Sequence, residues 1–170
     1  MTGRIFVDAN MFVYARDLGE PTKQPLAGEW LERLWQEQRG RTSTQALNEF
    51  YYAVTRKLKP GLTVEEAWDD VRSLLSWNPQ PIDASLLLRA REIEQRYRLS
   101  WWDSLIVGAA QLQECSVLLT EDLQDRSSYG GVTVRNPFVL GVSEEMATYA
   151  VAPAVASRHR PRGRPRRSSP

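Results

Sequence analysis

The sequence predicts an α/β domain with helices on both faces of a central parallel sheet, followed by a disordered basic tail. Short apolar runs of strand length alternate with longer segments of helical periodicity, which is typical of a parallel sheet. Apolar residues make up 42% of the chain and charged residues 25%, as in ordinary globular proteins. We expect one domain over residues 1–140, one more short helix over 141–152, and the tail over 153–170.

Three segments are predicted as strands. Residues 4–7 form an apolar run rich in β-formers, and residues 116–120 form a second. Residues 132–134 follow Gly130-Gly131 as a third strand. Such short, continuous apolar runs are typical of strands that are buried on both faces.

Five segments have apolar side chains at helical spacing. They are residues 26–37, 44–57, 64–76, 84–97 and 101–114. The third begins with the capping box Thr63 to Glu66, in which each side chain caps the other residue's backbone. Asp83 and Ser100 precede the fourth and fifth as N-caps. Asn136-Pro137-Phe138 marks the end of the compact unit.

The rarest residues exclude several chemistries. The chain has one histidine, His159, and one cysteine, Cys115. A lone cysteine makes no internal disulfide, so we expect Cys115 to be a small buried residue of a cytoplasmic protein. A Cys/His zinc site needs about four ligands, and a Ser-His-Asp triad would have to use His159 in the tail. No apolar run is long enough to cross a membrane, and the N-terminus lacks the features of a secretory signal.

The net charge of +1 conceals an asymmetry. The segment 153–170 contains no acidic residue and six arginines, which are Arg158, Arg160, Arg162, Arg164, Arg166 and Arg167. The remaining residues 1–152 hold 16 basic and 21 acidic residues, a net charge of −5. The acidic body and the basic tail therefore need separate explanations.

Two acidic residues follow predicted strands. Asp8 ends the first strand, and Asp122 follows the second strand just after Thr120 and Glu121. The carboxyl ends of parallel strands are where open α/β sheets bind their ligands. The structural alternatives are an N-cap or Asx turn for Asp8 and a turn for Asp122, where Glu121 or Asp125 would compete for any role.

Two further acids lie on apolar helices. Glu49 is on the face opposite the main apolar stripe of its helix, among small or apolar residues; a salt bridge to Arg56 or Arg4 is the structural alternative. Asp103 follows Trp101-Trp102 in a helix that is otherwise almost entirely apolar. Its structural alternative is a capping box with Ser100.

Taken together, the four acids predict a cation site. Two would end adjacent strands, and the helices that carry the other two must pack on the sheet. Each pair at about 5 Å would repel by roughly 3 kcal/mol at an effective dielectric of about 20, so such a cluster raises its pKa values or binds a cation. Mg²⁺ and Mn²⁺ prefer oxygen ligands. Metal-activated water attacking a phosphodiester is then the economical chemistry.

Other features bear on RNA binding. Arg56 and Lys57 could hold phosphate, or could simply favour the end of a helix. The tail arginines, represented by Arg158, Arg160, Arg162 and Arg164, could follow an RNA backbone or could be an unselected extension. Trp101 and Trp102 could stack on bases, but we expect them to pack in the core.

Four ordered segments resemble the motifs of PIN-domain ribonucleases, with the order and spacing of the bacterial VapC-type toxin branch. They are residues 6–14, 45–51, 99–107 and 118–125. With the ending at Asn136-Pro137-Phe138, the resemblance covers residues 4–138. It departs from the family at Arg126, which replaces the glycine expected just after Asp125, and in the basic tail.

The resemblance implies an α/β/α sandwich that binds Mg²⁺ or Mn²⁺ at the carboxyl ends of its strands and cuts single-stranded or looped RNA. Its catalytic acids fall on Asp8, Glu49, Asp103 and Asp122, with Asp8 and Asp103 as main metal ligands. Asn10, Thr120 and Asp125 are neighbours that would support or join the ligand set. It also implies a cognate antitoxin and a homodimer.

The prediction is therefore a metal-dependent endoribonuclease that is the toxin of a toxin–antitoxin pair. A non-catalytic RNA-binding relative is one alternative. An aspartyl-phosphate phosphotransferase with Asp8 as its nucleophile is another, although position 10 is Asn rather than a second Asp.

Overall fold

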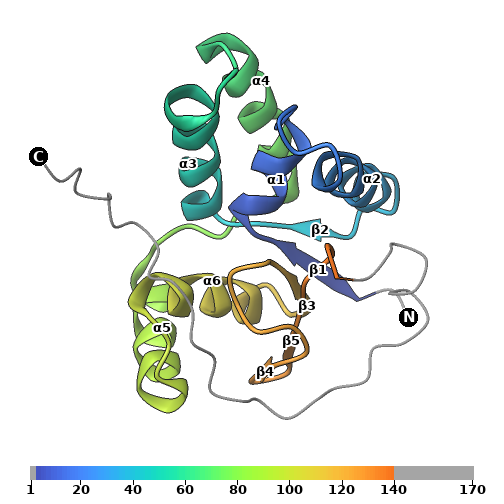
Figure 1. Cartoon of the computed structure of the whole chain (residues 1–170). Helices are drawn as coiled ribbons and strands as arrows, with labels where there is room; N and C mark the ends of the chain where they lie inside the picture. The colour runs from blue at the N-terminus through green and yellow to red at the C-terminus, as the bar shows by residue number, and fades with distance from the viewer. Residues whose placement is uncertain (1–2, 140–170) are drawn as a thin grey trace, which may run out of the picture.

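The computed structural model describes residues 3–139, which contain one five-stranded sheet (Figure 1). The strands are β1 (Arg4–Val7), β2 (Gly40–Arg41), β3 (Cys115–Leu119), β4 (Ser128–Tyr129) and β5 (Val132–Arg135). Their order is β2-β1-β3-β5-β4, and every neighbouring pair is parallel except β4 and β5. The predicted α/β class is confirmed. The predictions for residues 141–152 and 153–170 lie outside the described residues.

Six α-helices connect the strands within this part of the chain. They are α1 (Ala9–Ala15), α2 (Lys23–Gln36), α3 (Thr44–Tyr52), α4 (Val64–Leu74), α5 (Ala84–Tyr97) and α6 (Trp101–Leu112). All five predicted helices are present, but the predicted helix 44–57 becomes a π-helical turn from Ala53 to Lys57. Within residues 3–139, none of the helices combines the length and the apolar character that crossing a bilayer requires.

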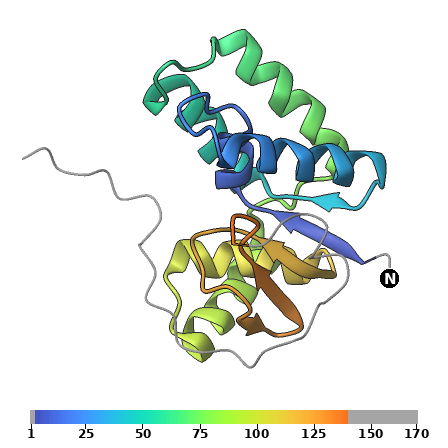
Figure 2. The ribbon, with the colours of Figure 1, turned by 45° about the vertical axis from the view of Figure 1, so that its right-hand side comes forward.

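The sheet lies between two helical layers. Helices α1–α4 cover one face, and α5 and α6 cover the other (Figures 1 and 2). Alternate strand residues serve the two layers, because successive side chains point to opposite faces. Ile5 and Val7 pack with the α1–α4 layer, whereas Phe6 and Leu118 pack with α5 and α6. The arrangement is a three-layer α/β/α sandwich.

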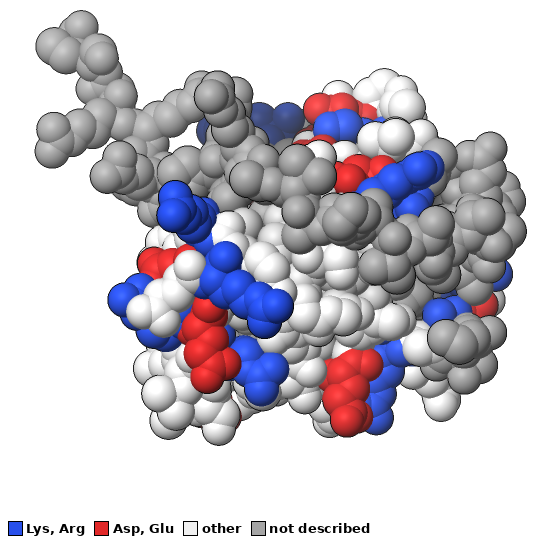
Figure 3. Space-filling model, turned by 90° about the horizontal axis from the view of Figure 1, so that it is seen from below, with Lys and Arg blue, Asp and Glu red and all other residues white. Residues whose placement is uncertain are grey.

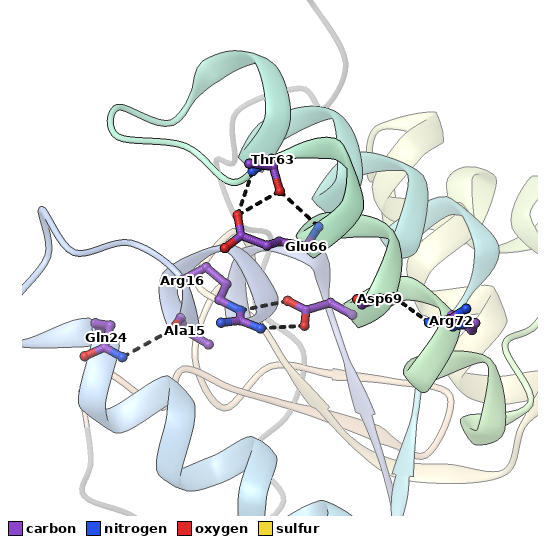
Figure 4. Close-up of polar contacts among 8 residues, drawn as sticks. Ala15, Arg16, Gln24, Thr63, Glu66, Asp69 and Arg72 are labelled. Carbon is purple, nitrogen blue, oxygen red and sulfur yellow. Dashed lines mark hydrogen bonds and ion pairs between the residues drawn. The ribbon is translucent and has the colours of Figure 1, made fainter.

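Polar contacts also hold the α1–α4 layer together (Figure 4). At the end of α1, the Arg16 guanidinium donates to both carboxylate oxygens of Asp70 on α4, at 2.7 and 2.5 Å. The predicted capping box is present, with Thr63 and Glu66 bonding to each other's backbone N–H at the start of α4. The Arg16–Asp70 pair fixes α4 relative to α1, which leads directly from the first strand, and the capping box fixes where α4 begins.

The opposite layer has a surface of mixed charge. Seen from below, basic and acidic side chains gather together on the side of α5 (Figure 3). On this helix Arg91 pairs with Glu94 at 2.6 Å and Arg89 with Glu92 at 3.7 Å. This surface of α5 is therefore not a uniformly basic patch.

Candidate active site

Asp8 lies where β1 passes into α1 and is completely buried. It is the N-cap of α1, and its Oδ1 accepts a hydrogen bond from the N–H of Ala9 at 2.7 Å. Its Oδ2 accepts one from Thr120 Oγ1 at 2.7 Å. The N-cap role and the placement at a strand end therefore occur together. The carboxylate is held by donors that follow two adjacent strands.

Thr120 joins the ends of β1 and β3. Besides donating to Asp8, its buried hydroxyl accepts from Asn10 Nδ2 at 2.9 Å and from the N–H of Asp122 at 3.1 Å. The hydroxyl therefore donates once and accepts twice within this group. Asp122 itself is exposed, and its Oδ2 accepts from Asn10 Nδ2 at 3.2 Å. Asp8, Asn10, Thr120 and Asp122 thus form one hydrogen-bonded group, which we call the strand-end group.

Asp103 is completely buried in the first turn of α6. Ser100 Oγ accepts from the N–H of Asp103 at 3.1 Å and donates to its Oδ2 at 2.8 Å. Ser100 is the helix N-cap, as predicted. In addition, the Ser100 hydroxyl donates to the Asp103 carboxylate. The N-terminus of a helix favours a nearby negative charge, which suits a carboxylate in this position.

Glu49 is half-buried on α3, and its Oε1 accepts from Gln45 Nε2 at 2.9 Å, one helical turn earlier. The same amide nitrogen donates to the carbonyl oxygen of Trp102 at 3.3 Å. Gln45 therefore places Glu49 beside the first turn of α6, which carries Asp103. The sequence motifs assigned no role to Gln45, although its spacing of four from Glu49 was a signal.

The remaining predicted site residues make other contacts. Asp125 accepts from the N–H of Asn136 at 2.9 Å, and its Oδ1 is 3.4 Å from Nε of the buried Arg135. These contacts tie the loop after β3 to the end of β5, and a supporting role of Asp125 at the site stays a prediction. Arg56 and Lys57 are exposed in the π-helical turn that follows α3. The tail arginines lie beyond the described residues.

Glu121 does not take the place of Asp122. Its carboxylate accepts hydrogen bonds from Tyr14 Oη and from Lys23 Nζ, the latter at 2.8 Å. The hydrogen bond with Glu121 raises the pKa of Lys23, and burial followed by the Glu121 contact raises the pKa of Tyr14. This ion pair anchors the loop that carries Asp122 to α1 and α2. Nothing in the sequence indicated that Tyr14 or Lys23 would take part.

The donor set has the chemistry of a hard divalent cation site. Asn10 Oδ1 is buried and accepts no hydrogen bond within residues 3–139, and it belongs to the strand-end group with Asp8 and Asp122. Oxygen atoms of this kind are the ligands that Mg²⁺ prefers. Across residues 3–139, no three histidine, cysteine or acidic side chains are arranged as a ready-made metal site.

Fold and site together define an α/β/α domain with acidic residues at the carboxyl ends of adjacent parallel strands. The PIN domain family model matches residues 5–125. The chain therefore belongs to the PIN domain family, as the sequence motifs predicted.

Solved structures that share this fold include three that we compare with the chain. A toxin–antitoxin complex from Klebsiella pneumoniae is 20% identical, with a TM-score of 0.54, over 79% of this chain and 97% of that chain. FitAcB from Neisseria gonorrhoeae is 18% identical, with a TM-score of 0.54, over 80% and 99%. VapC20 of Mycobacterium tuberculosis, a toxin that cleaves the sarcin–ricin loop, is 19% identical, with a TM-score of 0.50, over 67% and 86%. A comparison with curated proteins found no match.

Proposed function

We propose that this protein is a metal-dependent endoribonuclease and the toxin of a toxin–antitoxin pair. The observation that carries the proposal is the strand-end group, in which residues from the ends of β1 and β3 hold Asp8 and Asp122 together. Membership of the PIN domain family supports a nuclease. The likeness to the toxin–antitoxin complex from Klebsiella pneumoniae supports the antitoxin partner.

Asp8 and Asp103 are the proposed metal ligands, and Glu49 and Asp122 complete the catalytic acids. A bound Mg²⁺ or Mn²⁺ would polarise the phosphate and make water a better nucleophile. The protein's own groups orient these carboxylates. Thr120 and the N–H of Ala9 fix both oxygens of Asp8, and fixed groups need little reorganisation during the reaction.

The test compares the wild type with Asp8→Asn and Asp103→Asn, using cleavage of a labelled RNA and calorimetric titration with Mn²⁺. We expect both variants to fold, to lose at least about a hundredfold in cleavage rate, and to bind Mn²⁺ more weakly. A suitable control is Glu92→Gln on α5, which changes one exposed carboxylate remote from the proposed ligands.

The outcomes separate the alternatives. Cleavage at the wild-type rate in both variants would remove the catalytic assignment. A wild-type chain that binds RNA but neither binds Mn²⁺ nor cuts the RNA would be the non-catalytic relative. A phosphorylated Asp8, recovered after reaction with a phosphate donor, would favour the phosphotransferase instead.

The remaining parts of the proposal concern the binding partners of the protein and its location in the cell. An antitoxin would neutralise cleavage when it is mixed with the protein, and a homodimer would show twice the chain mass in solution. The cytoplasm stays a prediction from the single cysteine. The RNA-binding roles of Arg56, Lys57 and the tail arginines also stay predictions.

A further inference from the structure

Trp102 does not pack in the core, contrary to our expectation. Trp101 is partly buried against the α5–α6 core, whereas Trp102 is 42% exposed. Trp102 immediately precedes the buried Asp103, and its carbonyl oxygen accepts from the side chain that also binds Glu49. Trp102 thus belongs to the same helical turn as one proposed catalytic acid, and its backbone carbonyl contacts Gln45, which binds another.

A second exposed aromatic residue lies on the same face of α3. Gln45, Glu49 and Tyr52 are spaced four and three residues apart, which places them on one side of a helix. Tyr52 is 57% exposed and lies roughly 10 Å along the axis from Gln45, at 1.5 Å per residue. Lys57 Nζ lies 5.4 Å from the centre of the Tyr52 ring. We call these two exposed residues, Trp102 on α6 and Tyr52 on α3, the aromatic strip, because Gln45 joins the two helices that carry them.

The aromatic strip has the chemistry of a single-stranded nucleic acid site. Unpaired bases stack on aromatic side chains, and nearby cations contact the phosphates. Bases within a duplex are already stacked on one another and are not offered to such a surface. An exposed tryptophan and an exposed tyrosine on the two helices that carry Asp103 and Glu49, with Lys57 beside the tyrosine, match an unpaired strand that passes the proposed catalytic acids.

We propose that the aromatic strip binds unpaired bases of the RNA substrate beside the bond to be cut. This inference rests on the proposed ribonuclease function and names the part of the substrate that the site recognises. Trp102 is the principal contact, because its backbone carbonyl shares the Gln45 amide with Glu49 and because it precedes Asp103 in the chain. Tyr52 and Lys57 extend the binding surface along α3.

The experiment measures binding of a fluorescent ten-nucleotide single-stranded RNA by anisotropy in EDTA, where no divalent metal supports cleavage. We expect Trp102→Ala to weaken binding by about fivefold to a hundredfold, the range for removing one base–aromatic stack. Trp102→Phe retains a ring and should stay within about threefold of the wild type. Trp68→Ala is the matched control, because Trp68 is 50% exposed on α4, and it should bind as the wild type does.

A strand with abasic positions sharpens the test. Removing bases should weaken the wild type but have little further effect on Trp102→Ala, since that variant has no indole for the base to stack on. The inference would be overturned if Trp102→Ala bound single-stranded RNA as the wild type does. It would also be overturned if the substitution weakened binding of a duplex as much as binding of the single strand. A change in the mass of Trp102→Ala in solution would assign the indole to self-association and overturn it as well.

Cleavage assays keep the two proposals apart. If the wild type cuts RNA and Trp102→Ala binds normally, the aromatic strip is wrong and the nuclease proposal stands. If the wild type never cuts RNA but Trp102→Ala loses single-strand binding, the aromatic strip stands and the nuclease proposal fails.

Discussion

The hydroxyl of Thr120 donates a 2.7 Å hydrogen bond to Oδ2 of Asp8, and this bond connects the carboxyl ends of two neighbouring parallel strands. Both residues are completely buried. A hydrogen bond to a charged group contributes more than one between neutral groups. Thr120 is therefore central to the geometry of the proposed site even though it has no charge.

Replacing Thr120 with valine keeps the shape of the side chain and removes the hydroxyl. We expect Thr120→Val to lower the RNA cleavage rate by at least about tenfold and to destabilise the fold by about 1–3 kcal/mol, because a buried carboxylate oxygen loses its shortest hydrogen bond and keeps only a long one from Asn10. Cleavage kinetics and urea unfolding measure the two effects. Thr120→Ser retains the hydroxyl and should keep most of the cleavage rate and most of the stability of the wild type. Wild-type cleavage by Thr120→Val would contradict the role assigned to this hydrogen bond.

The loop after β3 contains a backbone position that suits glycine. Arg126 has φ +66°, a left-handed conformation that costs a residue with a Cβ about 1 kcal/mol. Arg126→Gly should therefore stabilise the protein by about 1 kcal/mol and raise Tm by roughly 2–4 °C. Arg126→Ala is the control, because it keeps the Cβ and removes only the exposed ion pair with Asp125. An equal gain in both variants would assign the effect to charge instead of to backbone conformation.

Cys115 is 4% exposed, and burial raises the pKa of its thiol to about 12 from an ordinary 9.0. The unfolded chain releases this proton at lower pH than the folded protein does. The thiol's contribution to stability is therefore complete below pH 9 and is lost as the pH rises from 9 toward 12. Urea midpoints measured from about pH 7 to about pH 10.5 should fall above pH 9.

The variant Cys115→Ala isolates this contribution. It should be less stable at about pH 7, because it leaves a small cavity, but its stability should depend less steeply on pH above 9. A slope identical to that of the wild type would show that other groups cause the alkaline destabilisation. Lys23 and Tyr14, whose pKa values are also raised, are those groups.

The basic tail allows a test of RNA binding that does not involve the site. Deleting residues 153–170 removes six arginines. We expect weaker binding of single-stranded RNA and a shallower dependence of log K on log salt, by about 0.7 for each phosphate that the tail neutralises. Titrations at several salt concentrations measure the slope. Unchanged affinity at low salt would show that the tail does not bind the RNA.

The sheet and its acids were predictable because they depend on local apolar runs and on one rule, namely that parallel strands have their carboxyl ends at the same edge of a sheet. The runs at residues 4–7 and 116–120 are adjacent strands in the structure, within one residue of the predicted bounds. Parallel neighbours place Asp8 and Asp122 at the same edge, as expected. By contrast, β2 and β4 have two residues each, which is too short for an alternating pattern to be recognised.

Gln45 and Lys23, which support the proposed catalytic acids, could not be predicted, because their roles depend on contacts between distant segments. The role of Gln45 depends on α3 packing beside the first turn of α6, and that of Lys23 depends on the loop after β3 reaching α2. No periodicity within either segment encodes such pairings. The helix α1 was also missed, because its seven residues directly follow a strand without a separating turn.

The order of the strands has a consequence for biosynthesis. Asp8 leaves the ribosome 112 residues before the hydroxyl that holds it, and β3 must pair with β1 before the two side chains meet. A nascent chain, or a product of interrupted translation that stops before β3, carries the first carboxylate without its neighbours. Under the proposed function, only copies whose synthesis has passed β3 and Asp122 would cut the RNA of the cell that makes them.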